Sequence, residues 1–464
     1  MFFLLATKDA DAQIMFQTHY GGNQDDGGSS VLQTDDGGYI VAGRTLSYGN
    51  GSNDIYVLKT DGNGNEVWTK TYGGNGWDAP YEIKKTLDNC YIIAGETSSF
   101  GAGASDAFLM KIDSNGDSIW FKTYGGSADD GAYSVDVCND NSFIVAGVTM
   151  SFGEGQSQTY LIKTNEYGDS LWTKEYGPSY ANCFGSTVIQ TSDFGYLVVG
   201  KFSYGNPKLH IIRTNNIGDT LWTKKYGYNG MYSGSTIRKI NNSGYAILGT
   251  IVNMNNVSDI RLIKINQNGD TIFTKDYGGF NNEVGGEVQK TNDNGFIITG
   301  LTQSYGAGGK DVYLIKTDES GIVQWTKTFG GAGDDWGGSV QQTSDNGYII
   351  AGYSKSFSNN YDVYLIKTDE NGVSGFEKIV PTSISLKTYP NPTDGLFTLQ
   401  WNGINEKNVT IQIFNLQGQE VYDKSINSEA QNSFYIDLAN KPKGIYIVRF
   451  KGNKTLFNNK VIMY

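Results

Sequence analysis

Residues for acid–base and metal chemistry are scarce in this sequence. Its 464 residues include two histidines, His19 and His210, and five arginines. Catalytic triads and most zinc sites depend on histidine, so the chain offers little material for either. The three cysteines, Cys90, Cys138 and Cys183, are an odd number without Cys-x-x-Cys spacing, which argues against a disulfide framework or a zinc knuckle. We interpret them as buried or partly buried thiols.

Long apolar runs are missing as well. No stretch reaches the ~18 apolar residues that a membrane-spanning helix needs, so we predict no transmembrane segment. A net charge of −12 argues against nucleic acid and anionic membrane surfaces as partners. No segment has helical periodicity. Instead, 61 glycines and 13% aromatic residues indicate short strands joined by tight turns rather than disorder.

The N-terminal residues have the features of an export signal. Residues 1–6 are apolar, and Ala10-Asp11-Ala12 has the small-x-small form of a cleavage site. The apolar run is short, and no Lys or Arg precedes it. We therefore predict that residues 1–12 are a secretory signal peptide with a truncated start. The alternative is an ordinary N-terminus.

A segment of about 52 residues occurs seven times. The copies align on a Tyr-Gly-Gly motif whose aromatic residue recurs at spacings of 52, 52, 52, 50, 51 and 52 residues. These residues are Tyr20, Tyr72, Tyr124, Tyr176, Tyr226, Tyr277 and Phe329. Each copy holds four strand-like segments separated by turn residues. This pattern predicts an all-β fold with a seven-bladed β-propeller over residues 13–378.

Two positions of the repeat indicate how the blades pack. An aromatic residue in the fourth strand is expected to fill the wedge between neighbouring blades. It occurs at Trp68, Trp120, Trp172, Trp222, Phe273 and Trp325. A glycine at the end of the second strand indicates a bulge or a close backbone approach. It occurs at Gly43, Gly95, Gly147, Gly200, Gly249, Gly300 and Gly352. We interpret both sets as structural.

The two ends of the repeat region complement each other. Residues 14–18 precede the first Tyr-Gly motif as residues 67–70 precede the second, so they correspond to a fourth strand without its own blade. The last copy ends in a degraded version of this strand at residues 372–377. We therefore predict that the N-terminal strand completes the last blade and closes the ring.

The pattern changes near residue 379, where four new motifs follow in order. Their residues are Tyr389, Pro390, Asn391, Pro392, Gly395, Gly418, Gly444, Tyr446 and Lys460. These motifs resemble the type A C-terminal sorting domain of the type IX secretion system of Bacteroidota. Alternating strands and Gly/Asn/Pro turns over the same ~80 residues independently indicate a small Ig-like β-sandwich. A carbohydrate-binding sandwich is the alternative.

The resemblance implies export and one partner. Sorting domains of this family direct their cargo through the type IX machinery, after which the cargo is attached to the cell surface or released. We therefore expect a linker and sorting domain over residues 379–464, the type IX machinery as a partner, and a secreted or surface location. The repeats also resemble uncharacterised repeat proteins of the same bacteria, which implies the fold and no activity.

Acidic residues recur at two positions of the repeat. Asp26, Asp78, Asp130, Glu283 and Asp335 follow the repeat tyrosine by six residues, and Asp54, Asp106, Asp259, Asp311 and Asp362 start the third strand. In a four-stranded blade both positions lie on one face of the ring, near the mouth of its channel. This face is a candidate for binding a ligand or a cation. We favour a structural role, in which each carboxylate accepts hydrogen bonds from its own turn. No cofactor or metal site is predicted, and Ca²⁺ is the one candidate cation.

Four turns before the fourth strand carry Asp, then Ser or Thr, then an apolar residue. This motif resembles the O-glycosylation signal of Bacteroidota. The acceptors are Ser118, Ser170, Thr220 and Thr271. We predict glycans at these positions, since hairpin turns are exposed. The alternative is that Asp-Ser and Asp-Thr are favourable turn exits.

The sequence favours a binding or adhesion module with a glycan or protein ligand. A rigid ring with variable loops suits recognition, and we expect a monomeric ring. A polysaccharide hydrolase or lyase and a structural surface-coat protein are the alternatives. No catalytic residue is proposed, because among 48 acidic residues a close carboxylate pair is inevitable.

Overall fold

The computed structural model describes residues 14–154, 156–227, 231–240, 244–253, 256–374, 385–402, 408–427, 433–451 and 456–464. The chain divides into two compact units, Met1–Glu377 and Lys378–Tyr464. The predicted signal peptide, residues 1–12, and the predicted linker up to residue 384 lie outside the described residues. In the described ranges, no helix is long and apolar enough to cross a membrane.

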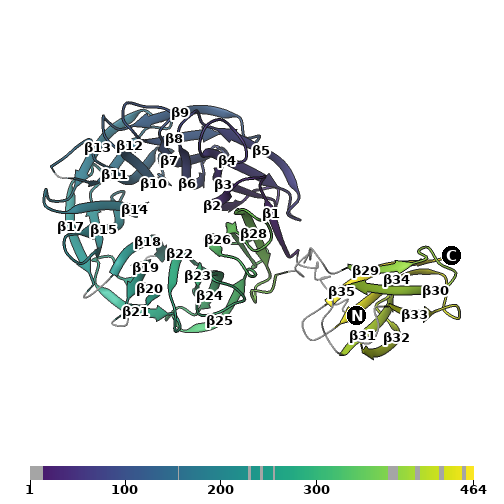
Figure 1. Ribbon diagram of the computed structural model, residues 1–464. Helices are drawn as coiled ribbons and strands as arrows, with labels where there is room; N and C mark the ends of the chain where they lie inside the picture. Colours follow the sequence, from purple (N-terminus) through teal and green to yellow (C-terminus); the bar gives the residue numbers. More distant parts are fainter. Residues whose placement is uncertain are drawn as a thin grey trace, which may run out of the picture. The chain divides into compact units, whose positions relative to one another are not determined.

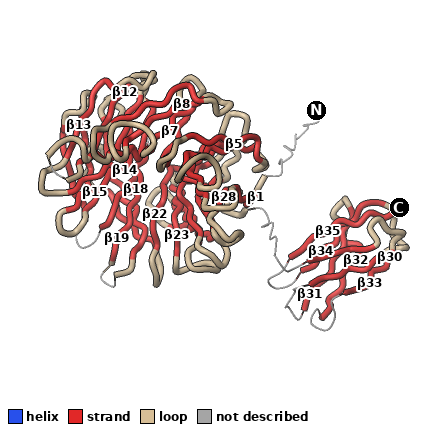
Figure 2. Tube along the Cα trace, turned by 45° about the horizontal axis from the view of Figure 1, so that its top comes forward, coloured by secondary structure: helices blue, strands red, loops and turns tan. Residues whose placement is uncertain are grey.

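The first unit is a ring of seven four-stranded antiparallel sheets, which confirms the predicted propeller (Figure 1). The first blade consists of β2(Asp26–Gln33), β3(Tyr39–Thr45), β4(Asp54–Thr60) and β5(Glu66–Tyr72), and the second of β6(Asp78–Lys85), β7(Tyr91–Thr97), β8(Asp106–Ile112) and β9(Ser118–Tyr124). The third consists of β10(Asp130–Val137), β11(Phe143–Thr149), β12(Gln158–Thr164) and β13(Ser170–Tyr176). The fourth consists of β14(Asn182–Gln190), β15(Tyr196–Ser203), β16(Lys208–Thr214) and β17(Thr220–Tyr226). The fifth blade consists of β18(Met231–Ile240), β19(Gly244–Val252), β20(Ser258–Ile265) and β21(Thr271–Tyr277). The sixth consists of β22(Glu283–Lys290), β23(Phe296–Thr302), β24(Asp311–Thr317) and β25(Val323–Phe329). The seventh combines β26(Asp335–Gln342), β27(Tyr348–Ser354) and β28(Asp362–Thr368) with β1(Phe16–Tyr20). In each blade the first strand borders the channel and the fourth lies outermost, and the described loops join the strands without helices (Figure 2).

The N-terminal strand closes the ring. β1 pairs antiparallel with β28, from Phe16 opposite Lys367 to Tyr20 opposite Val363. The seventh blade therefore takes three strands from the end of the repeat region and one from its beginning, as the sequence predicts. Because β28 is paired on both sides, its backbone groups are not left as an open edge.

The repeated aromatic residues hold neighbouring blades together. The hydroxyl of Tyr124 donates a 2.6 Å hydrogen bond to the carbonyl of Gly168, in the turn before the fourth strand of the next blade. The same glycine packs against Trp120, since a Cβ on Gly168 would lie 2.8 Å from the indole ring. With φ at +78°, this turn position also favours glycine by conformation. The Tyr-Gly-Gly and Trp motifs thus form one contact between blades.

A β-bulge in every innermost strand shapes the channel. Every blade has a residue out of register with the second strand at the equivalent position, and the fifth blade has a second one at Tyr232. The equivalent residues are Ser29, Tyr81, Tyr133, Ser186, Ser235, Gly286 and Gly338. The residue before each bulge faces the repeat glycine of the second strand, as Gly28 faces Gly43. A Cβ on Gly43 would overlap the carbonyl oxygen of Gly27, so the bulge requires a glycine there.

Acid is expected to destabilise the propeller through its two histidines. His19 stacks on Tyr364 in the β1–β28 pair, with ring centroids 4.5 Å apart. Burial lowers the pKa of His19, and that of the buried His210 in β16, to about 4. Both values lie below 6.5, the value for an unperturbed histidine. The unfolded state therefore binds more protons, and the free energy of unfolding falls as the pH drops from 6.5 to 4.

Each histidine contributes roughly 2–3 kcal/mol to this loss. Urea unfolding at a series of pH values measures it. His19→Phe keeps the stacked ring and is expected to reduce the pH dependence. An identical dependence in this variant would contradict the assignment to His19.

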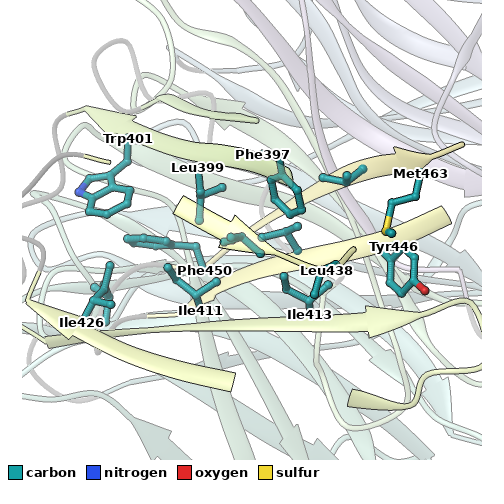
Figure 3. Close-up of a cluster of buried hydrophobic side chains, with 14 residues drawn as sticks. Phe397, Leu399, Trp401, Ile411, Ile413, Ile426, Leu438, Tyr446, Phe450 and Met463 are labelled. Atoms are coloured by element: carbon teal, nitrogen blue, oxygen red, sulfur yellow. The ribbon is translucent and has the colours of Figure 1, made fainter. Parts of the chain in front are cut away.

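The second unit is a small β domain of two sheets. One contains β29(Ser385–Tyr389), β30(Leu396–Asn402) and β33(Ser433–Asp437), and the other β32(Glu420–Asn427), β31(Asn408–Asn415), β34(Gly444–Lys451) and β35(Leu456–Met463). Side chains of both sheets, including Phe397, Trp401, Ile411 and Phe450, form one buried cluster (Figure 3). Alternating apolar residues along each strand supply this core.

Motif residues of the second unit tie its beginning to its end. The side-chain amide of Asn391 donates a 2.6 Å hydrogen bond to the carbonyl of Lys460 and accepts one of 2.9 Å from the N–H of Ile462. Gly395 has φ at +115°, and a Cβ there would lie 2.7 Å from the Cα of Ala439. The first motif therefore depends on the last strand for its position.

Candidate functional site

The ten repeat acids lie at the predicted strand ends, but eight of them are buried. Asp26, Asp54, Asp78, Asp106, Asp130, Glu283, Asp311 and Asp335 are at most 2% exposed, and Asp259 and Asp362 are partly exposed. They form pairs across neighbouring blades. For example, Asp54 of one blade and Asp78 of the next flank Gly73, and a Cβ on this glycine would contact both carboxylates. The first glycine of the Tyr-Gly-Gly motif thus leaves room for two acids.

Hydrogen bonds from nearby loops hold these carboxylates. Asp78 accepts a 2.9 Å bond from the N–H of Gly74 and a 2.6 Å bond from the hydroxyl of Ser99. Thr97 also donates its hydroxyl to Asp78. Burial raises the pKa of Asp54, and the charge of Asp78 adds to this shift, while the N–H of Asn50 opposes it. Within the described residues, no three His, Cys, Asp or Glu side chains come together as a metal site.

Calcium is expected to leave the melting temperature unchanged. The oxygens of Asp78 already accept hydrogen bonds from its own loops, so an added ion would have to displace them. Asp78→Asn is expected to be tolerated, because an amide oxygen still accepts from Gly74 and the repulsion with Asp54 is removed. Thermal unfolding with and without millimolar Ca²⁺ tests this. A rise of several degrees that a chelator reverses would identify a cation site instead.

The four candidate glycosylation acceptors begin outermost strands. Ser118, Ser170, Thr220 and Thr271 are exposed as the first residues of β9, β13, β17 and β21. The preceding aspartates pair with lysines of the neighbouring blade, as Asp117 does with Lys70 at 3.0 Å. The apolar residue after each acceptor also faces solvent, with Ile119 51% exposed. Accessibility of the whole motif is what an external modifying enzyme needs.

We predict glycans on one or more of these four residues in the native secreted protein. Intact-mass spectrometry is expected to show mass above that of the polypeptide, and peptide mapping to locate it. The first blade supplies an internal control, since Glu66 takes the place of the acceptor there. An unmodified mass would contradict the prediction.

The channel mouth holds an asymmetric cavity that the repeat pattern does not indicate. We call this cavity, of about 430 Å³, the channel cup. Three of the innermost strands, β2, β22 and β26, contribute glycines where side chains would fill the space, including Gly27, Gly286 and Gly338. Tyr81, the bulged residue of β6, forms the opposite wall. Glycine at the bulge positions of β22 and β26 therefore leaves open the space that a tyrosine occupies at the bulge of β6.

Aromatic rings and one cation line the channel cup. Trp336 of β26 and Tyr353 of β27 lie opposite each other in register and stack, with ring centroids 6.5 Å apart at 20°. Tyr81 packs edge-on against Tyr133 with centroids 5.1 Å apart. The guanidinium of Arg44, in β3, completes the lining. Burial raises the pKa of Tyr81 and Tyr353, so both phenols stay protonated and can donate hydrogen bonds.

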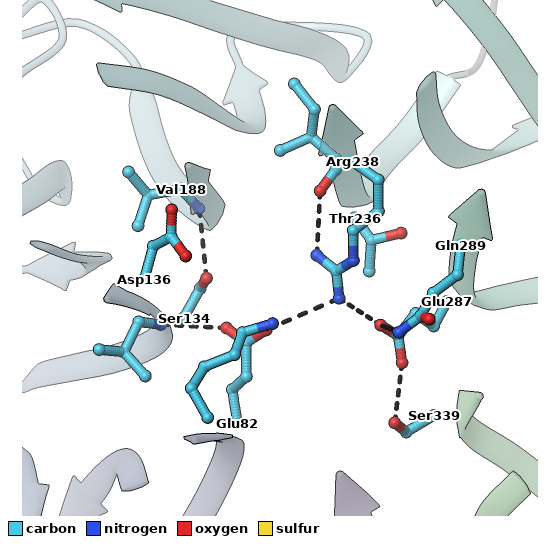
Figure 4. Close-up of polar contacts among 12 residues, drawn as sticks. Glu82, Ser134, Asp136, Val188, Thr236, Arg238, Glu287, Gln289 and Ser339 are labelled. Carbon is cyan, nitrogen blue, oxygen red and sulfur yellow. Dashed lines mark hydrogen bonds and ion pairs between the residues drawn. The ribbon is translucent and has the colours of Figure 1, made fainter. Parts of the chain in front are cut away.

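Charged side chains close the channel below the cup. A second cavity of about 160 Å³ shares Tyr81 with the cup and reaches Arg238. The Arg238 guanidinium forms an ion pair with Glu287 of the next blade and approaches Glu82, across the channel, to 3.7 Å (Figure 4). Glu287 also accepts 2.8 Å and 3.0 Å bonds from Ser339 and the N–H of Val340. The cup therefore has a polar floor.

Sequence reasoning missed the cup because its residues break the repeat. Trp336, Tyr81 and Arg44 occupy positions that hold small or different residues in most other copies. When the seven copies are compared, these residues stand out only as isolated departures from the repeat pattern. The bulge turns one position per blade toward the channel. Which position this is follows only from the register of the strands.

Comparison with known families identifies the second unit. Residues 387–464 match the family described as the secretion system C-terminal sorting domain. This confirms the predicted sorting domain, and it shows that the chain is exported by type IX secretion to the cell surface or the outside of the cell. A search of curated proteins finds no match.

Solved structures similar to this chain include propellers. A protein of unknown function from Dyadobacter fermentans aligns with a TM-score of 0.46 and 10% identity, over 77% of this chain and 98% of that chain. The β-propeller domain of the Trilobed protease from Pyrococcus furiosus aligns with a TM-score of 0.43 and 9% identity, over 75% and 99%. An endo-1,5-alpha-L-arabinanase from Thermotoga petrophila aligns with a TM-score of 0.32 and 12% identity, over 77% and 100%.

Proposed function

We propose that the exported propeller is a non-catalytic carbohydrate-binding module and that the channel cup is its binding site. The observation that carries this proposal is the group of Trp336, Tyr353 and Tyr81 around one hollow at the channel mouth. Binding sites for small ligands combine aromatic surfaces with a few polar groups that fix orientation. A sugar can use both kinds of group, because one face of a pyranose ring is apolar and can stack on an aromatic ring, while the hydroxyls at its edge can form hydrogen bonds.

The polar groups that a sugar needs come from the backbone and from tyrosine. β2, β22 and β26 are the last strands of their sheets on the channel side, so one backbone edge of each faces the channel. Glycines at Gly27, Gly286 and Gly338 leave this edge uncovered. The hydroxyl of Tyr81 lies 3.3 Å from Glu96, which orients the ring. The cup thus offers stacking surfaces beside donors and acceptors.

The charges below the cup support binding rather than hydrolysis. A glycoside hydrolase needs a carboxylic acid that is protonated at working pH. Burial favours this form in Glu82, but Lys84 and Arg238 outweigh it and hold the pKa of Glu82 below its ordinary value. Glu287 is tied to Arg238 and Ser339. Both acids are therefore committed to the floor, and Glu96, whose pKa burial raises, is engaged by the hydroxyl of Tyr81 at 3.3 Å.

A glycan array with the full chain, followed by titration calorimetry, tests the proposal. Trp336→Ala is expected to weaken binding about thirtyfold, because removing an aromatic anchor from a pocket costs about 2 kcal/mol. Gly27→Leu puts a side chain into the cup, where its Cβ meets Tyr353 at an ordinary contact distance of 3.5 Å, and is expected to have a similar effect. Tyr167→Ala removes a 63% exposed ring outside the cup and serves as the control.

Two results would contradict the proposal. Binding that survives both Trp336→Ala and Gly27→Leu would place the ligand elsewhere. Release of shortened products from a bound polysaccharide would show an enzyme.

A further inference from the structure

We propose that the channel cup selects acidic sugars and that Arg44 binds the carboxylate of a uronic acid residue. The inference rests on the proposed function, because it names the ligand class for the same cup. Arg44 is the one cation of the cup lining, in a chain with a net charge of −12.

Arg44 differs from the other arginines of the chain in having no protein partner. Arg213, Arg238 and Arg261 form ion pairs with Asp193, Glu287 and Asp276, and Arg449 lies over the ring of Phe414. For Arg44, no hydrogen bond or ion pair is found across the described ranges of the chain. It is the one exposed residue of β3, whose other six residues are buried. With a net charge of −12, the chain has many acids with which to pair it, yet this guanidinium stays free.

The position of Arg44 in the blade directs it to the cup. It follows Gly43, the glycine that faces the bulge, and lies opposite Gly27 in register. The equivalent residue of the preceding blade is Tyr353, so the cation and a stacking ring are neighbours on the rim. Arg44 lines the same cavity as Tyr81 and Tyr353.

The other cations near the rim are already engaged. Lys310 forms a 2.9 Å ion pair with Asp334. Lys355 lies over the ring of Tyr361, 5.2 Å from its centroid. Arg44 is thus the cation that remains available to a ligand.

The chemistry of a uronic acid fits this arrangement. Its carboxylate projects from the edge of the pyranose ring, so a ring stacked on Trp336 or Tyr353 extends the carboxylate sideways toward the rim. A planar guanidinium binds a planar carboxylate through two parallel N–H···O bonds. A neutral sugar would leave Arg44 unpaired. A sulfate ester can also offer two oxygens to a guanidinium, so it is the anionic ligand from which a carboxylate must be distinguished.

The test uses the full chain and matched polysaccharides. Polygalacturonate, alginate and hyaluronate are each compared with their carboxyl-reduced forms, in which the carboxylate becomes a hydroxymethyl group on the same backbone. Dextran sulfate represents sulfate esters. Arg44→Gln is compared with Lys201→Gln, because Lys201 follows the repeat glycine Gly200 at the equivalent position of the fourth blade but does not line the cup.

We expect at least one uronate polymer to bind at least about tenfold more tightly than its reduced form, as is typical of a charged hydrogen-bonded pair. Arg44→Gln is expected to abolish this difference, and Lys201→Gln to preserve it. Circular dichroism and melting temperatures confirm that both variants fold.

Two outcomes would overturn the inference, and they can be told apart. Equal binding of acidic and reduced or sulfated polymers, unaffected by Arg44→Gln but lost in Trp336→Ala, would refute acid selection and leave the cup as a carbohydrate site. Absence of binding to every polymer and to the glycan array would refute the proposed function together with the inference.

Discussion

Arg238→Ala is expected to lower the free energy of unfolding of the propeller by about 3 kcal/mol, because it leaves the buried Glu287 without its counter-ion, whereas Glu82 keeps its 2.7 Å ion pair with Lys84. The side chains of Glu82 and Glu287 are 12% and 8% exposed. Water can solvate them only in part after the guanidinium is removed. Urea unfolding at pH 7 measures the change.

A compensating variant separates charge from packing. Arg238→Met combined with Glu287→Gln removes both charges of this pair at similar volume and leaves Glu82 paired with Lys84, so it is expected to recover most of the lost stability. Arg261→Ala is the control, since the Arg261–Asp276 pair lies in a more exposed setting, with 21% and 44% of the side chains accessible. It is expected to cost less than about 1 kcal/mol. Equal losses in Arg238→Ala and Arg261→Ala would contradict the special role of the channel pair.

Removal of β1 is expected to destabilise the ring by about 5 kcal/mol or more, since one buried and one partly buried aromatic side chain are lost together with a whole strand. Tyr20 is 8% exposed in the core cluster of the first and seventh blades, and Phe16 packs against the same cluster. The deletion also opens the edge of β28 to pairing with other chains. Thermal unfolding and gel filtration are expected to show a lower melting temperature and self-association.

A chain that begins at Ile14 provides the matched control, because it retains β1. Tyr20→Phe removes only the hydroxyl that donates to the carbonyl of Gly64 and is expected to cost about 1 kcal/mol. If the chain without β1 melted at the same temperature as the control, ring closure would not contribute to stability.

The architecture was predictable because each of its contacts is repeated. Tyr124, Trp120 and Gly168 contribute to one blade contact, and six further copies of the segment made their positions stand out against variable residues. The closing strand was predictable for the same reason, since residues 14–18 match a repeat segment that has no blade of its own.

The site was less predictable, because recognition depends on what the repeats do not share. The conspicuous Asp78 and Asp54 are buried and engaged by their loops, whereas Arg44 and Trp336 occur once each. Each bulge also shifts the alternation of inward and outward side chains by one residue. That shift places Tyr81 in the channel, and no periodicity in the sequence records it.

The pairing of β1 with β28 also sets an order of events in time. Tyr20 and its partner Val363 are separated by more than 340 residues of chain. At a synthesis rate of about 5–20 residues per second, the first strand waits roughly 20–70 s before its partner exists. The last blade is therefore finished by the oldest part of the chain, and the ring cannot close while that part is held apart from the rest.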